Sequence, residues 1–333
     1  MEIFIYDKNR ERIGILQNYT SIQWQKCYDE RGEFLIVMNE TEDSMNYQIG
    51  NLLYKNDDKT IGYIEYVSSA EGKLELRGHL DNLSDRINYA TAKIEHVEKD
   101  VYDLINANKR GLEITTAQLQ GLTQTISSTE TTYKPLSETI SSICKLSGLG
   151  YRQVKSGDTF GLFELYKGGL NEDGVLSEDF NNLFVKEYLQ DISKFKNYAI
   201  VAGEGEGSAR RIVYVDRSAG GPKCELFVDA RDLQKTYRDD KDVEHTYTDA
   251  EYDNVLKQRG EQKLDEVKQI ESFKIDYDVT NESFKYGRDW FLGDILKAKS
   301  SHYGFVKHMR ASKINEVYES DYKVVATLEE VNI

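Results

Sequence analysis

Proline and cysteine are both scarce in this chain. Among 333 residues there are 2 prolines and 3 cysteines. Cys27, Cys144 and Cys224 lie far apart and form no CxxC pair, so the sequence supports neither a structural zinc site nor a disulfide framework. We expect the three thiols to be buried or idle in a reducing compartment.

Long apolar runs are absent as well. No stretch is long enough to cross a membrane as a helix, and the N-terminus MEIFIYDKNRERIG lacks the basic and apolar segments of a secretion signal. We therefore expect a protein that is made in the cytoplasm, carries no membrane anchor and is not exported by a signal peptide of its own.

Patterns that mark catalytic or metal sites are also missing. The 5 histidines never occur at HxxxH or HxxEH spacing, and there is no GxSxG nucleophile elbow. A glycosidase needs only two carboxylates at a suitable separation, and the 58 acidic residues leave that possibility open without favouring it. Glu204 and Glu206 are the best candidate pair, but a solvated loop explains them more simply. We predict no catalytic residue, no metal and no cofactor.

Acidic residues dominate the charge of the chain. The formal net charge of −15 opposes binding to a nucleic-acid backbone, which depends on lysine and arginine displacing counterions. It still allows a surface that DNA passes without being held. Tyrosine is unusually common, at 23 residues, and suits half-buried strand faces and protein contacts, because its ring is buried while its hydroxyl stays hydrogen-bonded.

The stretch YAIVAGEGEGSARRIVYVD, residues 198–216, looks at first like a glycine-rich phosphate cradle. Such a cradle requires a helix directly after the glycines, whose free N–H groups hold the anion. Here Gly203, Gly205 and Gly207 are followed by β-branched and aromatic residues, and the intervening glutamates would repel a phosphate. We predict a β-hairpin in which the glycines form a structural turn.

The order of patterns along the chain predicts a β-rich α+β protein. Residues 1–92 read as many short strands without helices, which favours a small β-barrel or sandwich domain. Residues 93–190 form an α+β middle domain with helices near Val97–Ile105 and Leu136–Leu146, the second ended by Gly148. Residues 191–333 return to strands, as a second barrel-like domain. One long helix at about 249–268 interrupts it, with Thr248 and Glu251 as its capping box.

Four motifs in series resemble a known family, the tail hub or tail-associated (Tal-like) proteins of long-tailed phages that infect Gram-positive bacteria. They are Trp24 with Gly32-Glu33-Phe34; Gly62-Tyr63-Ile64-Glu65 leading to Leu76-Arg77-Gly78 and Asp85-Arg86-Ile87; Val201 to Gly207 followed by Arg210; and Gln258-Arg259-Gly260 with Leu292-Gly293-Asp294-Ile295-Leu296. The family pattern supplies no catalytic residues. Gly293 and Asp294 are therefore carried over only as structural turn positions, beside Gly203, Gly205 and Gly207.

The resemblance implies a non-enzymatic virion protein, a tail-tip or baseplate hub of a phage or prophage. Similar proteins are trimers whose two barrel domains per chain mimic a six-fold ring, and they also occur in contractile tails and tailocins. Such a hub closes or extends the tail tube, adapts its symmetry for tip proteins, and contacts the tube, the distal tail and the tip. DNA passes its channel without specific binding. The expected location is the virion tail, and the host cytoplasm during assembly. The alternatives are a tail-associated cell-wall glycan or peptidoglycan hydrolase and a carbohydrate-binding module.

Overall fold

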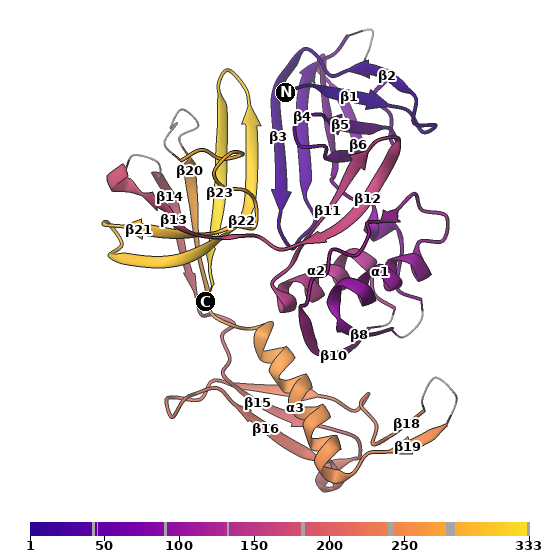
Figure 1. The fold of residues 1–333 in the computed structure, drawn as a ribbon, viewed down its shortest axis with the longest axis vertical. Coiled ribbons are helices and arrows are strands. Elements are labelled where there is room, and N and C mark those ends of the chain that lie inside the picture. The colour runs from indigo at the N-terminus through magenta and orange to yellow at the C-terminus, as the bar shows by residue number, and fades with distance from the viewer. Residues whose placement is uncertain are drawn as a thin grey trace. The chain divides into compact units, whose positions relative to one another are not determined.

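The computed structural model describes residues 1–41, 44, 46–89, 92–131, 133–180, 184–238, 243–277 and 284–331. Over these residues the protein is β-rich with three α-helices, and its chain divides into two compact units (Figure 1). Unit 1 consists of Met1–Tyr188 and Ser272–Ile333, and unit 2 is Leu189–Glu271. The predicted β-rich α+β class is confirmed. The three predicted domains, 1–92, 93–190 and 191–333, stay a prediction.

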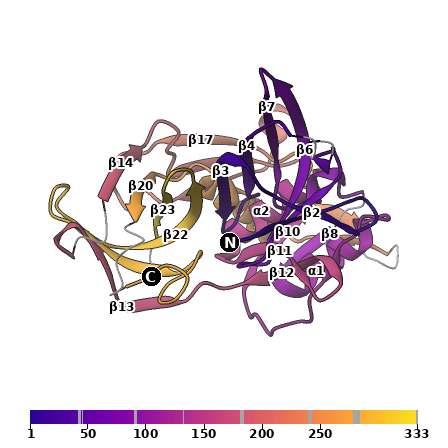
Figure 2. The same ribbon diagram turned by 90° about the horizontal axis from the view of Figure 1, so that it is seen from above.

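One open sheet of thirteen strands organises unit 1. Its main path runs β14-β20-β23-β22-β3-β4-β7-β6-β5-β1-β2, and β21 branches from β22 and pairs with β13. Figure 2 shows the β6–β7 hairpin projecting beyond the other N-terminal strands. The strands are β1 (Ile3–Tyr6), β2 (Arg12–Ile15), β3 (Tyr19–Cys27), β4 (Glu33–Asn39), β5 (Leu52–Lys55), β6 (Ile61–Ala70), β7 (Lys73–His79), β13 (Leu170–Ser177), β14 (Phe184–Asp191), β20 (Ile270–Tyr277), β21 (Ile295–Ser300), β22 (Phe305–Tyr318) and β23 (Tyr322–Glu330).

The N-terminal and C-terminal strands meet where β3 pairs antiparallel with β22, with Trp24 opposite Glu316. This pairing explains why the predicted barrels are not found. A closed N-terminal barrel would need the outer edge of β3 for β1 or β2, but β22 occupies that edge, and none of the sheets over the described residues closes on itself. The apolar faces of the strands still form two separate cores. One holds Ile22, Trp24, Phe34, Ile36, Leu53, Ile64 and Leu76, and the other holds Leu176, Phe273, Ile275, Trp290, Leu296, Met309 and Leu328.

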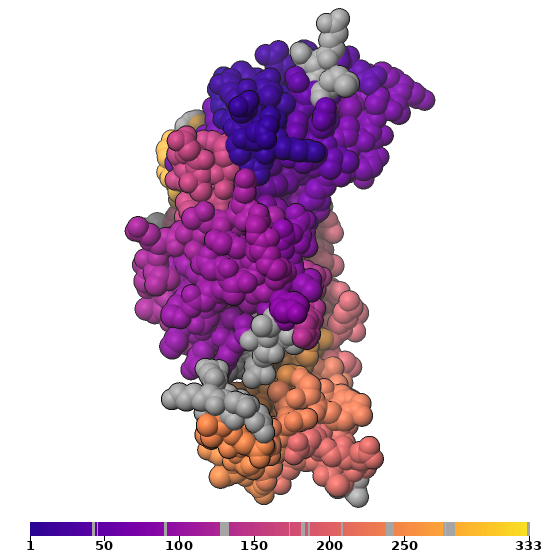
Figure 3. Space-filling view, turned by 90° about the vertical axis from the view of Figure 1, so that its right-hand side faces the viewer, coloured from indigo at the N-terminus to yellow at the C-terminus, as the bar shows by residue number. Residues whose placement is uncertain are grey.

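The middle segment of unit 1 packs two helices against short sheets. On the face seen in Figure 3 it lies next to the N-terminal strands. As the 3.6-residue pattern predicted, α1 (Val97–Asn108) buries Val101, Leu104 and Ile105. Gly148 ends α2 (Leu136–Ser147) in the left-handed conformation, with φ of 69°. The other elements here are η2 (Leu83–Asp85), β8 (Ala92–His96), β9 (Thr115–Thr116), β10 (Thr125–Thr131), β11 (Gly150–Ser156) and β12 (Thr159–Tyr166).

Unit 2 packs helix α3 (Asp249–Asp265) on one face of a three-stranded sheet. Strand β15 (Tyr198–Ala202) lies between β16 (Ile212–Asp216), which is antiparallel to it, and β17 (Glu225–Asp229), which is parallel. The predicted capping box of Thr248 and Glu251 starts α3. Gly260 lets the helix approach the sheet closely, since a Cβ there would lie 2.7 Å from a Val201 methyl group. Unit 2 also contains η4 (Gly207–Ala209), β18 (Thr236–Arg238) and β19 (Glu244–Thr246), and η3 (Glu178–Phe180) precedes it.

Unit 2 is an insertion between two strands that are neighbours in the main sheet. The chain leaves through β14 and returns through β20, and these two strands pair with each other. None of the described helices is long and apolar enough to span a membrane. Cys27 and Cys144 are buried and Cys224 is half-buried, all three as free thiols, and burial raises the pKa of Cys27 to about 12.

Candidate functional site

The glycines of the 198–216 stretch lie in the turn between β15 and β16. The two strands pair antiparallel as predicted, and a three-residue 3₁₀ turn, not an α-helix, begins at the last glycine, Gly207. Gly205 has φ of 101° and Gly207 has φ of 52°. Gly203 is needed for space, since a Cβ there would lie 2.5 Å from the Tyr252 hydroxyl. Tyr252 of α3 holds this turn, because its hydroxyl accepts the Glu204 N–H at 2.9 Å.

Gly293 and Asp294 lie in unit 1, in the segment before β21, so the predicted turn residues belong to two different units. Asp294 ties this segment to the start of β13. One carboxylate oxygen accepts the Gly169 N–H at 2.7 Å, and the other accepts the Phe291 N–H at 2.8 Å. Gly293 has φ of 94°, and a Cβ there would lie 2.2 Å from the Cε2 atom of Tyr28.

Tyr28 joins three parts of unit 1. Tyr28 is the residue directly after β3. Gly150, at the start of β11, approaches the same edge of its ring as Gly293 does, and a Cβ added to Gly150 would lie 2.3 Å from Cε2 of Tyr28. The Tyr28 hydroxyl donates to the Gly148 carbonyl and accepts the Gly168 N–H, both at 3.0 Å. Arg310 of β22 lies 4.7 Å from the ring centre. Only glycine fits at both contacts, so the N-terminal sheet, the helical segment and the C-terminal strands are locked around one side chain.

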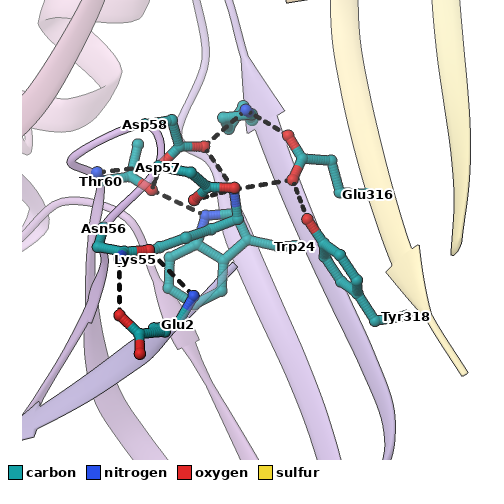
Figure 4. A network of polar contacts seen from close by, with 10 residues as sticks. Glu2, Trp24, Lys55, Asn56, Asp57, Asp58, Thr60, Glu316 and Tyr318 are labelled. Carbon is teal, nitrogen blue, oxygen red and sulfur yellow. Dashed lines mark hydrogen bonds and ion pairs between the residues drawn. The ribbon is translucent and has the colours of Figure 1, made fainter.

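A buried ion network lies beside this junction (Figure 4). The Lys26 ammonium is 2.7 Å from Asp58 and 2.6 Å from Glu316. The Lys55 ammonium is 3.0 Å from Asp58 and 2.8 Å from Glu316, and it also reaches Asp57 at 2.7 Å. The side chains of Lys55 and Glu316 are 1% and 4% exposed, so their charges are stable here only because they are paired.

Hydrogen bonds from uncharged side chains complete the network. Tyr318 donates its hydroxyl to Glu316 at 2.7 Å. Thr60 donates to Asp58 at 2.6 Å and accepts the indole N–H of Trp24 at 3.0 Å. The network therefore connects a core tryptophan of the N-terminal strands to β22 of the C-terminal strands, and each buried charge has at least two partners.

The two lysines, Asp58 and Glu316 keep their charges in the network. Burial would lower the pKa of Lys26 and Lys55, but the charges of Asp58 and Glu316 outweigh burial, raising the pKa of Lys55 to about 12 and that of Lys26 well above its usual value. Burial would raise the pKa of Asp58 and Glu316, and the two lysines instead hold both values below the usual range. A group that stays ionised at every ordinary pH cannot act as a general acid or base near neutrality.

A cavity of about 640 Å³ opens beside the junction, and six of its 23 lining residues are carboxylates. Each of these already has a cation or a backbone N–H as partner: Asp57, Asp58 and Glu316 contact lysines of the network, Asp81 contacts Arg31, Glu30 contacts Lys145 and Lys313, and Asp294 contacts Gly169 and Phe291. Among the described residues no cluster of histidine, cysteine or carboxylate side chains is arranged to hold a metal ion. Carboxylates that are already paired in this way suit a rigid connection between the N-terminal and C-terminal strands.

Sequence reasoning missed Tyr28 and the ion network. One signal was present: Lys55 ends the apolar strand Leu52-Leu53-Tyr54-Lys55, where a lysine has to find a buried counter-charge. Tyr28 gave no signal, because it is one of 23 tyrosines.

Comparisons with known proteins show which family and which solved structures this chain is similar to. Residues 95–327 match the family model of the Siphovirus ReqiPepy6 Gp37-like protein. No match is found among curated protein sequences. The structure is similar to the 43 kDa tail protein of prophage MuSo2 from Shewanella oneidensis, with a TM-score of 0.61 and 13% identity over 98% of this chain and 97% of that one.

Two further tail proteins have the same fold. One is the prophage tail protein gp18 from Listeria monocytogenes EGD-e, with a TM-score of 0.58 and 11% identity over 99% and 94% of the two chains. The other is a tail protein from Neisseria meningitidis MC58, with a TM-score of 0.56 and 10% identity over 99% and 96%. The resemblance to phage tail proteins is confirmed, and the chain belongs to the Siphovirus ReqiPepy6 Gp37-like protein family.

Proposed function

We propose that this chain is a non-enzymatic structural subunit of a phage or prophage tail, and that it forms the hub at the tail tip or baseplate. The observation that carries the proposal is the full-length match of fold. The similarity to the MuSo2 tail protein covers 98% of this chain and 97% of that one.

The two cores of unit 1 support a trimeric hub. One core lies among the N-terminal strands and the other among the C-terminal strands, and the β3–β22 pairing makes them one continuous sheet. Three chains would then present six β-rich halves to a six-fold tail tube, which is the symmetry match that a hub has to make. The Tyr28 junction and the ion network would keep the halves at a fixed spacing within each chain.

A shallow groove formed by residues of β3, β4, β6, β7 and β22 supports a passage that does not retain DNA. Its volume is about 550 Å³, and its lining includes amides and side chains of both charge signs, among them Gln23, Gln25, Asn315, Glu33 and Arg77. Such a surface offers few fixed cations to phosphates, and the net charge of −15 opposes their binding further. In the assembled ring we expect acidic residues to predominate on the surface that faces the axis.

Electron cryomicroscopy of tails purified from the phage or induced prophage tests the proposal. We expect three copies at the tip end of the tube, in contact with tube, distal-tail and tip proteins. Absence of the chain from the tail, a copy number incompatible with three-fold symmetry, or a basic channel wall would overturn it. Zymography of the purified chain on host cell walls tests the non-enzymatic part, where a clearing zone would count against it. The same tails show whether the chain stays in the virion after assembly in the host cytoplasm.

A further inference from the structure

Three loops of the middle segment of unit 1 present an exposed aromatic surface. Tyr89 and Tyr133 are 69% and 70% exposed, and Ile87 beside them is 44% exposed. The two tyrosine rings pack edge to face, with centroids 6.5 Å apart. We call Ile87, Tyr89 and Tyr133 the tyrosine surface. We propose that it is a docking site for a second copy of this chain.

Buried amides fix the backbone under this surface. Asn88 is fully buried between Ile87 and Tyr89, its N–H donates to the Lys134 carbonyl at 2.8 Å, and its own carbonyl accepts the Tyr133 N–H at 2.7 Å. Asn108 at the end of α1 is 4% exposed and accepts the Tyr89 N–H at 2.8 Å. The two tyrosines are therefore held in position by the protein interior.

Two arginines brace the same loops. Arg86 donates to the carbonyls of Lys109 and Arg110, and Arg110 donates back to the carbonyl of Ile87. These bonds join residues 86–89 to residues 108–111. A surface that is rigid before binding loses little conformational entropy when a partner covers it, and tyrosine has few rotatable bonds to immobilise.

Tyr133 also adopts a backbone conformation that few residues tolerate. Its φ is 53°, in the left-handed region. Strain of this kind persists only where the surrounding structure enforces it, and it concentrates at binding sites. Here it places an aromatic ring in solvent beside a second one, an arrangement that burial in the folded chain does not explain.

The charge around the tyrosine surface is opposite to that of the chain. Residues 85–89, 108–111 and 133–136 contain four cations, Arg86, Lys109, Arg110 and Lys134, and a single carboxylate, Asp85, whereas the whole chain has a net charge of −15. The two arginines bond carbonyl and amide oxygens, and no ion pair of any of the four cations occurs among the residues that the structure describes. The partner that complements this surface is acidic.

A second copy of the same chain supplies that acidity. Identical copies with a strongly negative charge repel each other unless one contact surface carries the opposite sign. Subunits arranged head to tail in a ring need two different surfaces that fit each other, and a basic aromatic patch on an acidic protein meets that need. Arginine and tyrosine are also the residues that most often dominate the energy of such contacts. This inference rests on the proposed ring assembly and names a surface within it.

The test is sedimentation velocity of the purified full chain across a wide concentration range at low and at high salt. Wild type should associate reversibly, and more weakly at high salt, because screening reduces the attraction between cations and carboxylates. The double variant Tyr89→Ala/Tyr133→Ala should raise the dissociation constant roughly tenfold or more. The variant Lys109→Glu/Lys134→Glu should also weaken association and should remove most of its salt dependence.

Tyr214→Ala is the matched control, since Tyr214 is 57% exposed but lies in unit 2, and it should associate as wild type does. Circular dichroism and the unfolding midpoint show whether each variant is folded. A wild-type chain that stays monomeric at every concentration overturns the inference, as does equal association of the double tyrosine variant. Loss of association in the Tyr214 variant to the same extent also overturns it. The presence of the chain in tails is measured separately, so failure here leaves the proposed function standing.

Discussion

Lys26 and Glu316 form an ion pair across the junction of β3 and β22, with 2.6 Å between Nζ and Oε1 and side chains 12% and 4% exposed. The pair joins residues 290 positions apart in the sequence. It lies where the N-terminal and C-terminal strands meet, so its loss should be felt by both halves of unit 1.

Glu316→Gln should lower the free energy of unfolding by roughly 3–5 kcal/mol, because Lys26 and Lys55 would keep their charges with one carboxylate partner fewer. Chemical denaturation at neutral pH measures it. Asp103→Asn is the control, since Asp103 pairs with Lys99 on the surface, where both side chains are more than half exposed, and should cost less than about 1 kcal/mol. Equal effects of the two substitutions would contradict the importance assigned to the buried network.

Asp29→Asn should stabilise the protein at high pH and not at low pH. Burial raises the pKa of Asp29 to about 6 from an ordinary value of 3.8, and Lys145 only partly opposes this. The folded state therefore binds the proton more tightly than the unfolded state, so stability falls as pH rises from about 4 through 6. The asparagine variant escapes that loss, which corresponds to roughly 1–3 kcal/mol.

Urea denaturation of Asp29→Asn and wild type at several pH values checks this. The difference in unfolding free energy should be near zero at low pH and should grow to a plateau above the folded pKa of about 6. Low pH is the control condition, because Asp29 is then protonated in both the folded and the unfolded state. A stabilisation that is the same at both ends of the pH range would show that Asp29 is not the titrating group.

Gly293→Ala should be more harmful than Gly287→Ala. Both glycines have positive φ, 94° and 82°, so both substitutions incur backbone strain of roughly 1–2 kcal/mol. Only at Gly293 would the new methyl group meet the ring of Tyr28, whereas nothing lies within 4 Å at Gly287. We expect an additional loss of about 2 kcal/mol at Gly293, measured by chemical denaturation. Equal losses would mean that the Tyr28 ring moves aside freely.

Gly205→Val should lower the stability of the β15–β16 hairpin by roughly 1–3 kcal/mol, because Gly205 has φ of 101° and lies against the Ala209 carbonyl. Glu206→Ala, at the next position, should change stability by less than about 0.5 kcal/mol, as expected of an exposed side chain. ATP and NAD should leave the melting temperature unchanged. A saturable shift with either nucleotide would restore the phosphate-binding interpretation.

Local patterns were sufficient to predict the helices and the hairpin. The stripe of Val101, Leu104 and Ile105 marked α1, and Thr248 with Glu251 marked the start of α3, because each signal lies within a few residues of the element that it forms. The pairing of β3 with β22 has no such signal. Alternating side chains show that a strand has a buried face, but they do not show which distant strand lies beside it.

The contacts around Tyr28 were also only partly predictable, because they join residues that are far apart in the sequence. The family resemblance flagged Gly293 and Asp294, but their roles depend on Tyr28 and Gly169, which are far away in the sequence. The predicted barrels are not found because they too depend on a pairing between distant strands. Closing the N-terminal barrel requires β3 to have a free edge, and β22 occupies that edge.

The pairing of β14 with β20 makes the main sheet independent of the segment that is inserted between these two strands. Because the strands before and after the insertion are hydrogen-bonded neighbours, the main sheet requires only that residues 192–269, which connect these two strands, begin and end close together. Their length and content are free to change while the sheet stays intact. Unit 2 is thus the part of the protein that evolution or an engineer can exchange as a cassette, with a reporter or a foreign binding domain in its place.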